Sequence, residues 1–169
     1  MRWIVWGAVL VLAACTRPPS SRGVPADAAP PAADTAMVLA LERGPCFGAC
    51  PVYTVSVRGS GLVRFEGRRF VRDSGVVTEM IAPARVDSLL RAVQAAGFFD
   101  FADDYGYGAP GCGRYATDLP TVVLEVRAPD GARKRVRHDR GCADAPPALS
   151  HLEQRIDEVL GTGRWTGAR

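Results

Sequence analysis

The chain has 169 residues, of which 47% are hydrophobic and 23% charged, and its formal net charge is +3. The length suits one domain, the composition is that of an ordinary globular protein, and the small positive charge gives no reason to expect a nucleic-acid partner. These values exclude a collagen-like chain, a disordered chain and a polytopic membrane protein. The five cysteines are an odd number, which needs an explanation.

The N-terminus is typical of an export signal. One positive charge, Arg2, precedes an apolar run from Trp3 to Ala14, which is shorter than the roughly 20 residues that span a bilayer. The sequence Leu12-Ala13-Ala14-Cys15 resembles the bacterial lipobox. This resemblance implies that residues 1–14 are a lipoprotein signal peptide and that Cys15 carries acyl groups such as palmitate, which would anchor the chain in the membrane. The alternative is an ordinary signal cleaved near Ala14.

The segment after the lipobox predicts location and spacing. Thr16, and no aspartate, follows the cysteine, and by resemblance to the lipoprotein sorting rule this favours the outer membrane, facing the periplasm. Residues 15–36 are rich in proline and alanine and show no hydrophobic period, so they are expected to be an extended tether rather than part of a core.

Residues 37–169 are expected to form a single domain. Alternating apolar residues predict strands over Pro51–Arg58 and Leu62–Glu66, one or two strands within Gly67–Ile81, and a hairpin of Thr121–Ala128 with Ala132–His138. Glycine-rich turns connect the strands of each hairpin.

Two amphipathic helices complete the predicted fold. One begins near Pro83 and ends near Gly97, and the other follows Pro146-Pro147 and ends at Gly161. The order is ββ(β)α followed by ββα. This order predicts an α+β fold, an antiparallel sheet packed by two helices.

The remaining cysteines predict two disulfides, because an exported domain folds in an oxidising compartment. They are Cys46, Cys50, Cys112 and Cys142, and three pairings are possible. We favour Cys46–Cys50, because a four-residue separation can bring two Cα atoms within disulfide range. Cys112–Cys142 would then tie a long loop to the end of the last hairpin.

The segment Gly44–Val55, with its Cys-Phe-Gly-x-Cys-Pro-x-Tyr motif, resembles the opening of an uncharacterised bacterial envelope family often found in lipoproteins. The resemblance extends from about Glu42 to the C-terminus and implies fold and location but no activity. Further matching segments are Gly59-Ser60-Gly61, Ala96-Gly97-Phe98-Phe99, Thr117–Thr121, His138 with Gly141-Cys142, and Gly161–Gly167.

The cysteine motif also permits a copper or thiol redox site. Cys46-x-x-x-Cys50-Pro51 resembles the motif of copper chaperones that use a distant histidine, for which His138 is the candidate. Two thiolates and an imidazole suit Cu(I). In that family, however, the motif precedes a helix of a thioredoxin-like fold, whereas here it precedes a strand. A structural disulfide is therefore the preferred interpretation, with no metal or cofactor.

A long glycine-containing loop, Asp103–Pro120, is the candidate binding surface, because long loops are often functional. The alternative is a turn-rich loop held by Cys112, and for His138 a hydrogen-bonded histidine at the sheet edge. The candidate residues are Asp103, Asp104, Tyr105, Tyr107, Arg114, Tyr115, Asp118 and His138.

A basic run on the last hairpin is a second candidate contact. Alternation places Arg133, Arg135 and Arg137 on one face of the strand. Such a run is often only a solvated or edge-protecting strand. If it is functional, it would contact anionic lipid, lipopolysaccharide or cell-wall polymer, with an affinity that falls with salt.

Together these features predict a non-catalytic binding or interaction module, anchored to the bacterial envelope. No Gly-x-Ser-x-Gly nucleophile motif occurs in the sequence. The expected partners are the membrane, through the lipid anchor, and an envelope protein or an anionic envelope polymer. The alternative function is a thiol redox or Cu(I)-handling protein built on Cys46, Cys50 and His138.

Overall fold

The computed structural model describes residues 37–167. The predicted signal peptide (1–14), the acylated Cys15 and the tether (15–36) lie outside the described residues. Between residues 37 and 167, no helix is long and apolar enough to cross a bilayer.

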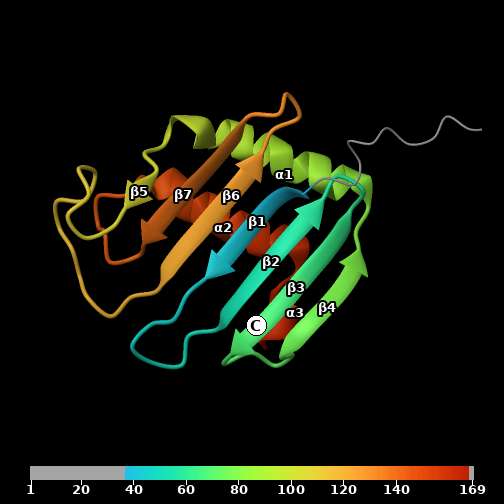
Figure 1. Ribbon diagram of the computed structural model, residues 1–169, viewed down its shortest axis with the longest axis horizontal. Helices are drawn as coiled ribbons and strands as arrows, with labels where there is room; N and C mark the ends of the chain where they lie inside the picture. Colours follow the sequence, from blue (N-terminus) through green and yellow to red (C-terminus); the bar gives the residue numbers. More distant parts are fainter. Residues whose placement is uncertain (1–36, 168–169) are drawn as a thin grey trace, which may run out of the picture. The chain divides into compact units, whose positions relative to one another are not determined.

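One mixed sheet, almost entirely antiparallel, forms the frame, and both long helices pack on the same face of it (Figure 1). The spatial order of strands is β4-β3-β2-β1-β6-β7-β5, and only β5 and β7 run parallel. The α+β prediction is thus confirmed. The strands are β1 (Met37–Arg43), β2 (Val52–Arg58), β3 (Leu62–Arg69), β4 (Gly75–Met80), β5 (Asp104–Tyr105), β6 (Thr121–Arg127) and β7 (Arg133–Asp139).

The central strand, β1, was not predicted from the sequence. It pairs with β2 on one side and with β6 on the other, so it joins the two predicted hairpins into one sheet. Leu39 and Leu41 are both buried on the helix-covered face. Residues Met37–Leu41 of β1 are all apolar, so this strand lacks the alternation of apolar and polar residues that predicted the others.

The helices begin and end at the residues that the sequence indicated. Helix α1 (Pro83–Ala95) and helix α2 (Pro147–Leu160) each start with a proline in the first turn, where the missing N–H costs nothing. Gly97 and Gly161 follow with φ of 65° and 67°, the left-handed conformation that ends helices. A short 3₁₀ helix, η2 (Phe98–Asp100), follows α1, and α3 (Gly163–Thr166) follows α2.

The core lies between the sheet and the helices. Phe65 of β3, Leu124 of β6, Leu149 and Ile156 of α2 are almost completely buried there. Trp165 of α3 joins the same core, with its ring centroid 5.0 Å from that of Phe65. Burial of this ring holds α3 against β3, which matters for the site described below.

The two ends of the sheet differ. At the tether end, β1 begins, and Met37 pairs with Arg58 while Arg127 pairs with Arg133. At the loop end, β1 finishes, and the long connections 44–51, 106–120 and 140–146 gather. Figure 1 shows the β6–β7 hairpin and these long connections at opposite ends of the strands.

Both predicted disulfides form, and both lie at the loop end. The Cα–Cα distance is 5.8 Å for Cys46–Cys50 and 5.4 Å for Cys112–Cys142. The second bridge fastens the 106–120 loop to the chain that leaves β7. Close packing there also requires Gly141, because a Cβ at this position would collide with the carbonyl oxygen of Ala116.

We expect the two bridges to contribute unequally to stability. Loop-closure entropy assigns about 2 kcal/mol to the Cys46–Cys50 ring and about 3.5 kcal/mol to the Cys112–Cys142 ring, because the second ring is longer. Replacing both cysteines of each bridge with alanine and comparing urea unfolding midpoints tests this order. An equal or larger loss from the Cys46–Cys50 pair would contradict it.

Candidate functional site

The face of the sheet that the helices leave uncovered carries an arginine stripe at the tether end. Cross-strand register places Arg127 opposite Arg133, in the row where β1 begins beside Arg58. Arg135 lies in the next row, opposite Glu125. We call Arg127, Arg133 and Arg135 the arginine stripe.

The stripe is not explained by local pairing. Like charges directly opposite each other on a sheet are destabilising, yet Arg127 and Arg133 occupy such a pair. Arg133 and Arg135 are exposed, and neither makes an ion pair with any described residue. Farther along the face, by contrast, Arg64 pairs with Glu66 at 2.7 Å and Arg137 with Asp104 at 2.9 Å. The stripe therefore presents positive charge to solvent.

The structure disperses the residues of the predicted loop surface. Asp103 and Asp104 lie at β5 and are paired with Lys134 and Arg137. Tyr107 is 82% exposed. The remaining exposed or half-exposed members each have a local partner: the Tyr115 ring lies 5.3 Å from that of Tyr107, Arg114 pairs with Asp144, and Asp118 accepts a hydrogen bond from Thr117.

Two residues of that predicted surface need correction. Tyr105 is 6% exposed and His138 is 3% exposed, so neither can contact a partner. His138 Nδ1 lies 2.7 Å from Glu153 Oε1, and the Tyr105 hydroxyl accepts a hydrogen bond from the backbone N–H of Ala102. Both residues belong to the core because β5 and β7 pair beneath the loop.

The loop that carries the other candidates is held firmly by its neighbours. The Tyr115 hydroxyl donates to Asp139 over 2.7 Å, which raises the pKa of this phenol. The carboxylate of Asp144 accepts from the backbone N–H groups of Gly113 and Arg114. The Arg114 N–H is the main reason that the pKa of Asp144 lies below its usual value.

The cysteine motif does not present thiols. Cys46 and Cys50 are bonded to each other, and the ring nitrogen Nδ1 of His138 faces Glu153. Within residues 37–167, no group of three or more histidine, cysteine or acidic side chains is arranged to hold a metal ion. The copper alternative therefore gains no support from the geometry.

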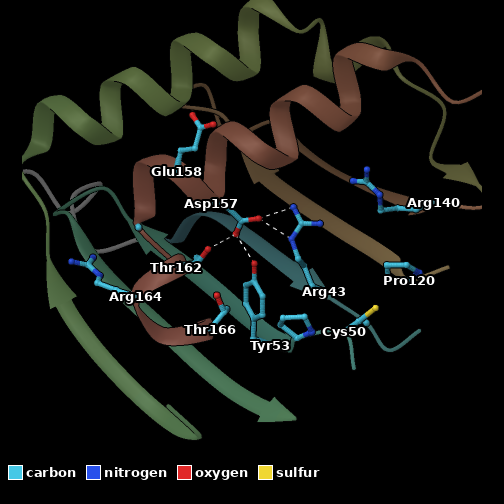
Figure 2. Close-up of a pocket in the computed structure, with 14 residues that line it drawn as sticks. Arg43, Cys50, Tyr53, Pro120, Arg140, Asp157, Glu158, Thr162, Arg164 and Thr166 are labelled. Carbon is cyan, nitrogen blue, oxygen red and sulfur yellow. Dashed lines mark hydrogen bonds and ion pairs between the residues drawn. The ribbon is translucent and has the colours of Figure 1, made fainter. Parts of the chain in front are cut away.

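A pocket of about 690 Å³ opens at the loop end (Figure 2). The C-terminal turn of α2, helix α3 and the start of β2 form its walls, together with the chain around Pro51 and Pro120. In Figure 2, Arg43 and Tyr53 point from the sheet toward Asp157 of α2. The charged residues that line the pocket are Arg43, Arg140, Asp157, Glu158 and Arg164.

Asp157 is the centre of a dense hydrogen-bond network. Arg43 donates to its Oδ2 through Nε at 2.8 Å, and Arg43 Nη2 lies 2.6 Å from the same oxygen. The hydroxyls of Tyr53 and Thr162 donate to Oδ1 over 2.6 and 2.8 Å. Four donors thus occupy the four acceptor positions of this carboxylate.

The network raises the pKa values of two of its members, Arg43 and Tyr53. Burial is the largest single influence and would lower the pKa of Arg43, but the charge and hydrogen bond of Asp157, together with Tyr53 and Glu153, outweigh it and raise the pKa. Burial raises the pKa of Tyr53 well above its usual value, and the negative charge of Asp157 adds to the effect. Both shifts favour the form present at neutral pH, a charged guanidinium and a neutral phenol.

A second carboxylate, Glu153, lies behind the pocket and is completely buried. His138 contacts its Oε1, and Arg140 donates to its Oε2 over 3.2 Å. Arg43 Nη1 lies 4.0 Å from the same Oε2. Two guanidinium groups therefore converge on one acid at the inner side of the pocket.

Sequence reasoning missed the pocket. It placed Arg43 outside any strand and gave Asp157 no role. Two signals were available: Asp157 immediately follows the buried Ile156 in the helical pattern, and the segment Leu152–Asp157 is part of the resemblance to the envelope family. Its partners are 114 and 104 residues away in the chain, and local periodicity cannot pair residues so far apart.

Tyr53→Phe tests the network through pH. The lost hydrogen bond to a charged acceptor should lower stability at pH 7 by about 2 kcal/mol. Because the folded-state pKa of Tyr53 is raised, its contribution is complete below the ordinary tyrosine pKa of about 10 and is lost as pH rises above it. The difference in unfolding free energy between the two proteins should therefore narrow above about pH 10. A difference that stays constant would contradict this.

Comparison with known proteins gives a family but no activity. The family model described as "Domain of unknown function (DUF6438)" matches residues 37–160, which include the whole sheet and both long helices. A search of the curated proteins returns no significant match. The match covers most of the chain, and the protein belongs to the DUF6438 family.

Proposed function

We propose that the protein is a lipid-anchored, non-catalytic binding module of the bacterial envelope that rests its arginine stripe on anionic headgroups at the membrane surface. The observation that carries the proposal is the position of the stripe. It lies at the end of the sheet where β1 begins, and β1 continues directly from the predicted tether and acyl anchor.

The proposal explains why two arginines, Arg127 and Arg133, are tolerated directly opposite each other at this end. Each basic residue near an anionic bilayer contributes about 1 kcal/mol of attraction, and the attraction fades within a Debye length. A tether that leads from an anchor in the bilayer keeps the domain near the surface, so weak contacts become effective through high local concentration. The flat, uncovered face of a sheet also suits a flat partner.

The anchor is tested separately from the stripe. In an intact bacterial host, the mature chain should begin at Cys15 and carry acyl groups, detected by labelling with palmitate and by mass spectrometry. Cys15→Ser should abolish the palmitate label, because the acylated side chain is gone. A chain that starts after Ala14 without any acyl group would reject lipidation.

The stripe is tested by vesicle binding of the predicted mature chain, residues 15–169, made with Cys15→Ser so that it carries no acyl group. We compare vesicles of phosphatidylcholine alone with vesicles that also contain phosphatidylglycerol. The parent chain should bind the vesicles with phosphatidylglycerol more tightly. At low salt, Arg133→Gln together with Arg135→Gln should reduce this gain in affinity roughly 30-fold, since each arginine contributes about 1 kcal/mol. High salt should also reduce the affinity that the parent chain gains from the anionic lipid, because salt screens the charges.

The matched control removes the same charge from the other layer of the fold. Arg91 of α1 and Arg155 of α2 are exposed on the helices, and Arg91→Gln with Arg155→Gln should leave the gain nearly unchanged. Equal losses in the two double variants would show only a net-charge effect and reject the stripe. Binding to soluble dextran sulfate, but not to anionic vesicles, would assign the stripe to an anionic polymer instead.

A further inference from the structure

The pocket at the loop end has the size of a ligand site. Its volume of about 690 Å³ lies within the range of small-molecule sites. The Cys46–Cys50 ring fixes one side of it next to Pro51, and the tilted ring of Tyr53 forms part of the floor (Figure 2). These surfaces are apolar and rigid, while the charged groups gather at the inner end.

The acids of the pocket have little capacity left for a ligand. Asp157 accepts four hydrogen bonds from three residues of the protein itself. Glu153 is completely buried and is contacted on both oxygens. Glu158 is paired with Arg155 on the outer surface of α2. A ligand would therefore find few free acceptors here.

The guanidinium groups of Arg43 and Arg140, by contrast, have N–H groups that remain available to a ligand. Arg43 uses Nε and Nη2 on Asp157, and its Nη1 is 4.0 Å from Glu153, beyond hydrogen-bond distance. Arg140 uses one contact, from Nη1 to Glu153. A guanidinium carries five N–H groups, so several on each residue have no acceptor among the described residues. The side chains are 17% and 31% exposed, so water or a ligand can reach them.

The two groups are also close enough to act together. Arg43 Nη1 and Arg140 Nη1 lie within 4.0 Å and 3.2 Å of the same oxygen of Glu153. An oxygen acid that lies against both would receive charge-assisted hydrogen bonds from a preformed pair. Arginine forks match carboxylate and phosphate geometry, so such contacts are strong and directional.

We propose that this pocket binds a small oxygen acid, a carboxylate or phosphate on a sugar-sized body, with the acid group against Arg43 and Arg140. The body lies over the apolar wall of Pro51, Pro120 and the Tyr53 ring. The Asp157 network holds Arg43 in place but is already saturated, so it acts as a positioning group and not as a ligand contact. This site is separate from the arginine stripe and does not depend on lipidation.

Trp165 offers a direct signal of binding. The sequence contains three tryptophans, Trp3, Trp6 and Trp165. The first two lie in the predicted signal peptide, so the mature chain from residue 15 has only Trp165. This ring is 4% exposed, and the guanidinium carbon of Arg164, which lines the pocket, lies 4.4 Å from its centroid. A ligand that fills the pocket should change the environment of Arg164 and with it the fluorescence of Trp165.

The probes share one body and differ in one group: glucuronate, glucose 6-phosphate and glucose. We expect a saturable fluorescence change with at least one of the two acids and none with glucose. The acid that binds more tightly identifies a carboxylate or a phosphate site. Arg140→Gln should weaken binding at least tenfold, whereas Arg91→Gln on the exposed side of α1 should leave it unchanged.

Two further variants keep the result decisive. Arg140→Lys retains the charge beside Glu153 but loses the fork, and it should also weaken binding, even if the glutamine variant fails to fold. Arg133→Gln with Arg135→Gln should leave pocket binding intact, which separates this site from the stripe. Non-saturable changes, an equal response to glucose, or unchanged binding in folded Arg140→Lys would each overturn the proposal.

Discussion

The loop end of the domain depends on the contact between the carboxylate of Asp157 and the guanidinium of Arg43. This ion pair joins the C-terminal half of α2 to the last residue of β1, and the Tyr53 hydroxyl extends it to β2. A largely buried ion pair is stable only when its remaining donors and acceptors are satisfied. Every acceptor position of the Asp157 carboxylate has a donor, so this condition is met for the acid. The contact therefore fixes where α2 and the following α3 lie against the sheet. The pocket walls follow from that placement.

The sequence was most informative where structure is local. Alternation on a pleated strand and turn residues between strands predicted the hairpins β2–β3 and β6–β7. Proline starts and glycine ends bounded α1 and α2. Strand β1 was missed because its apolar run Met37–Leu41 shows no alternation, and one of its two partners, β6, begins 84 residues after Met37. Position in the sheet is a tertiary property, which no local pattern contains.

For the candidate sites, too, the sequence predicted local features but not contacts between distant segments. Alternation was enough to place Arg133 and Arg135 on one face, although only the register across β6 shows that Arg127 joins them. His138 was placed in the candidate binding surface, with a hydrogen-bonded histidine at the sheet edge as the alternative, and its contact with Glu153 agrees with that alternative. The short β5 covers β7, and Glu153 of α2 faces the ring from the other layer. Both covering groups come from distant segments, so the burial of His138 could not be read from its neighbours.

The two disulfides are distributed unevenly over the fold. Both cross the loop end, whereas the tether end is held by strand pairing and core packing. The frame of the sheet can therefore assemble before any cysteine is oxidised, but the pocket rim is covalently fixed only afterwards. Thiols remain reduced in the bacterial cytosol and are oxidised after export. Under the proposed export, the Cys46–Cys50 side of the proposed ligand pocket would therefore be covalently fixed only after the chain has left the cytosol.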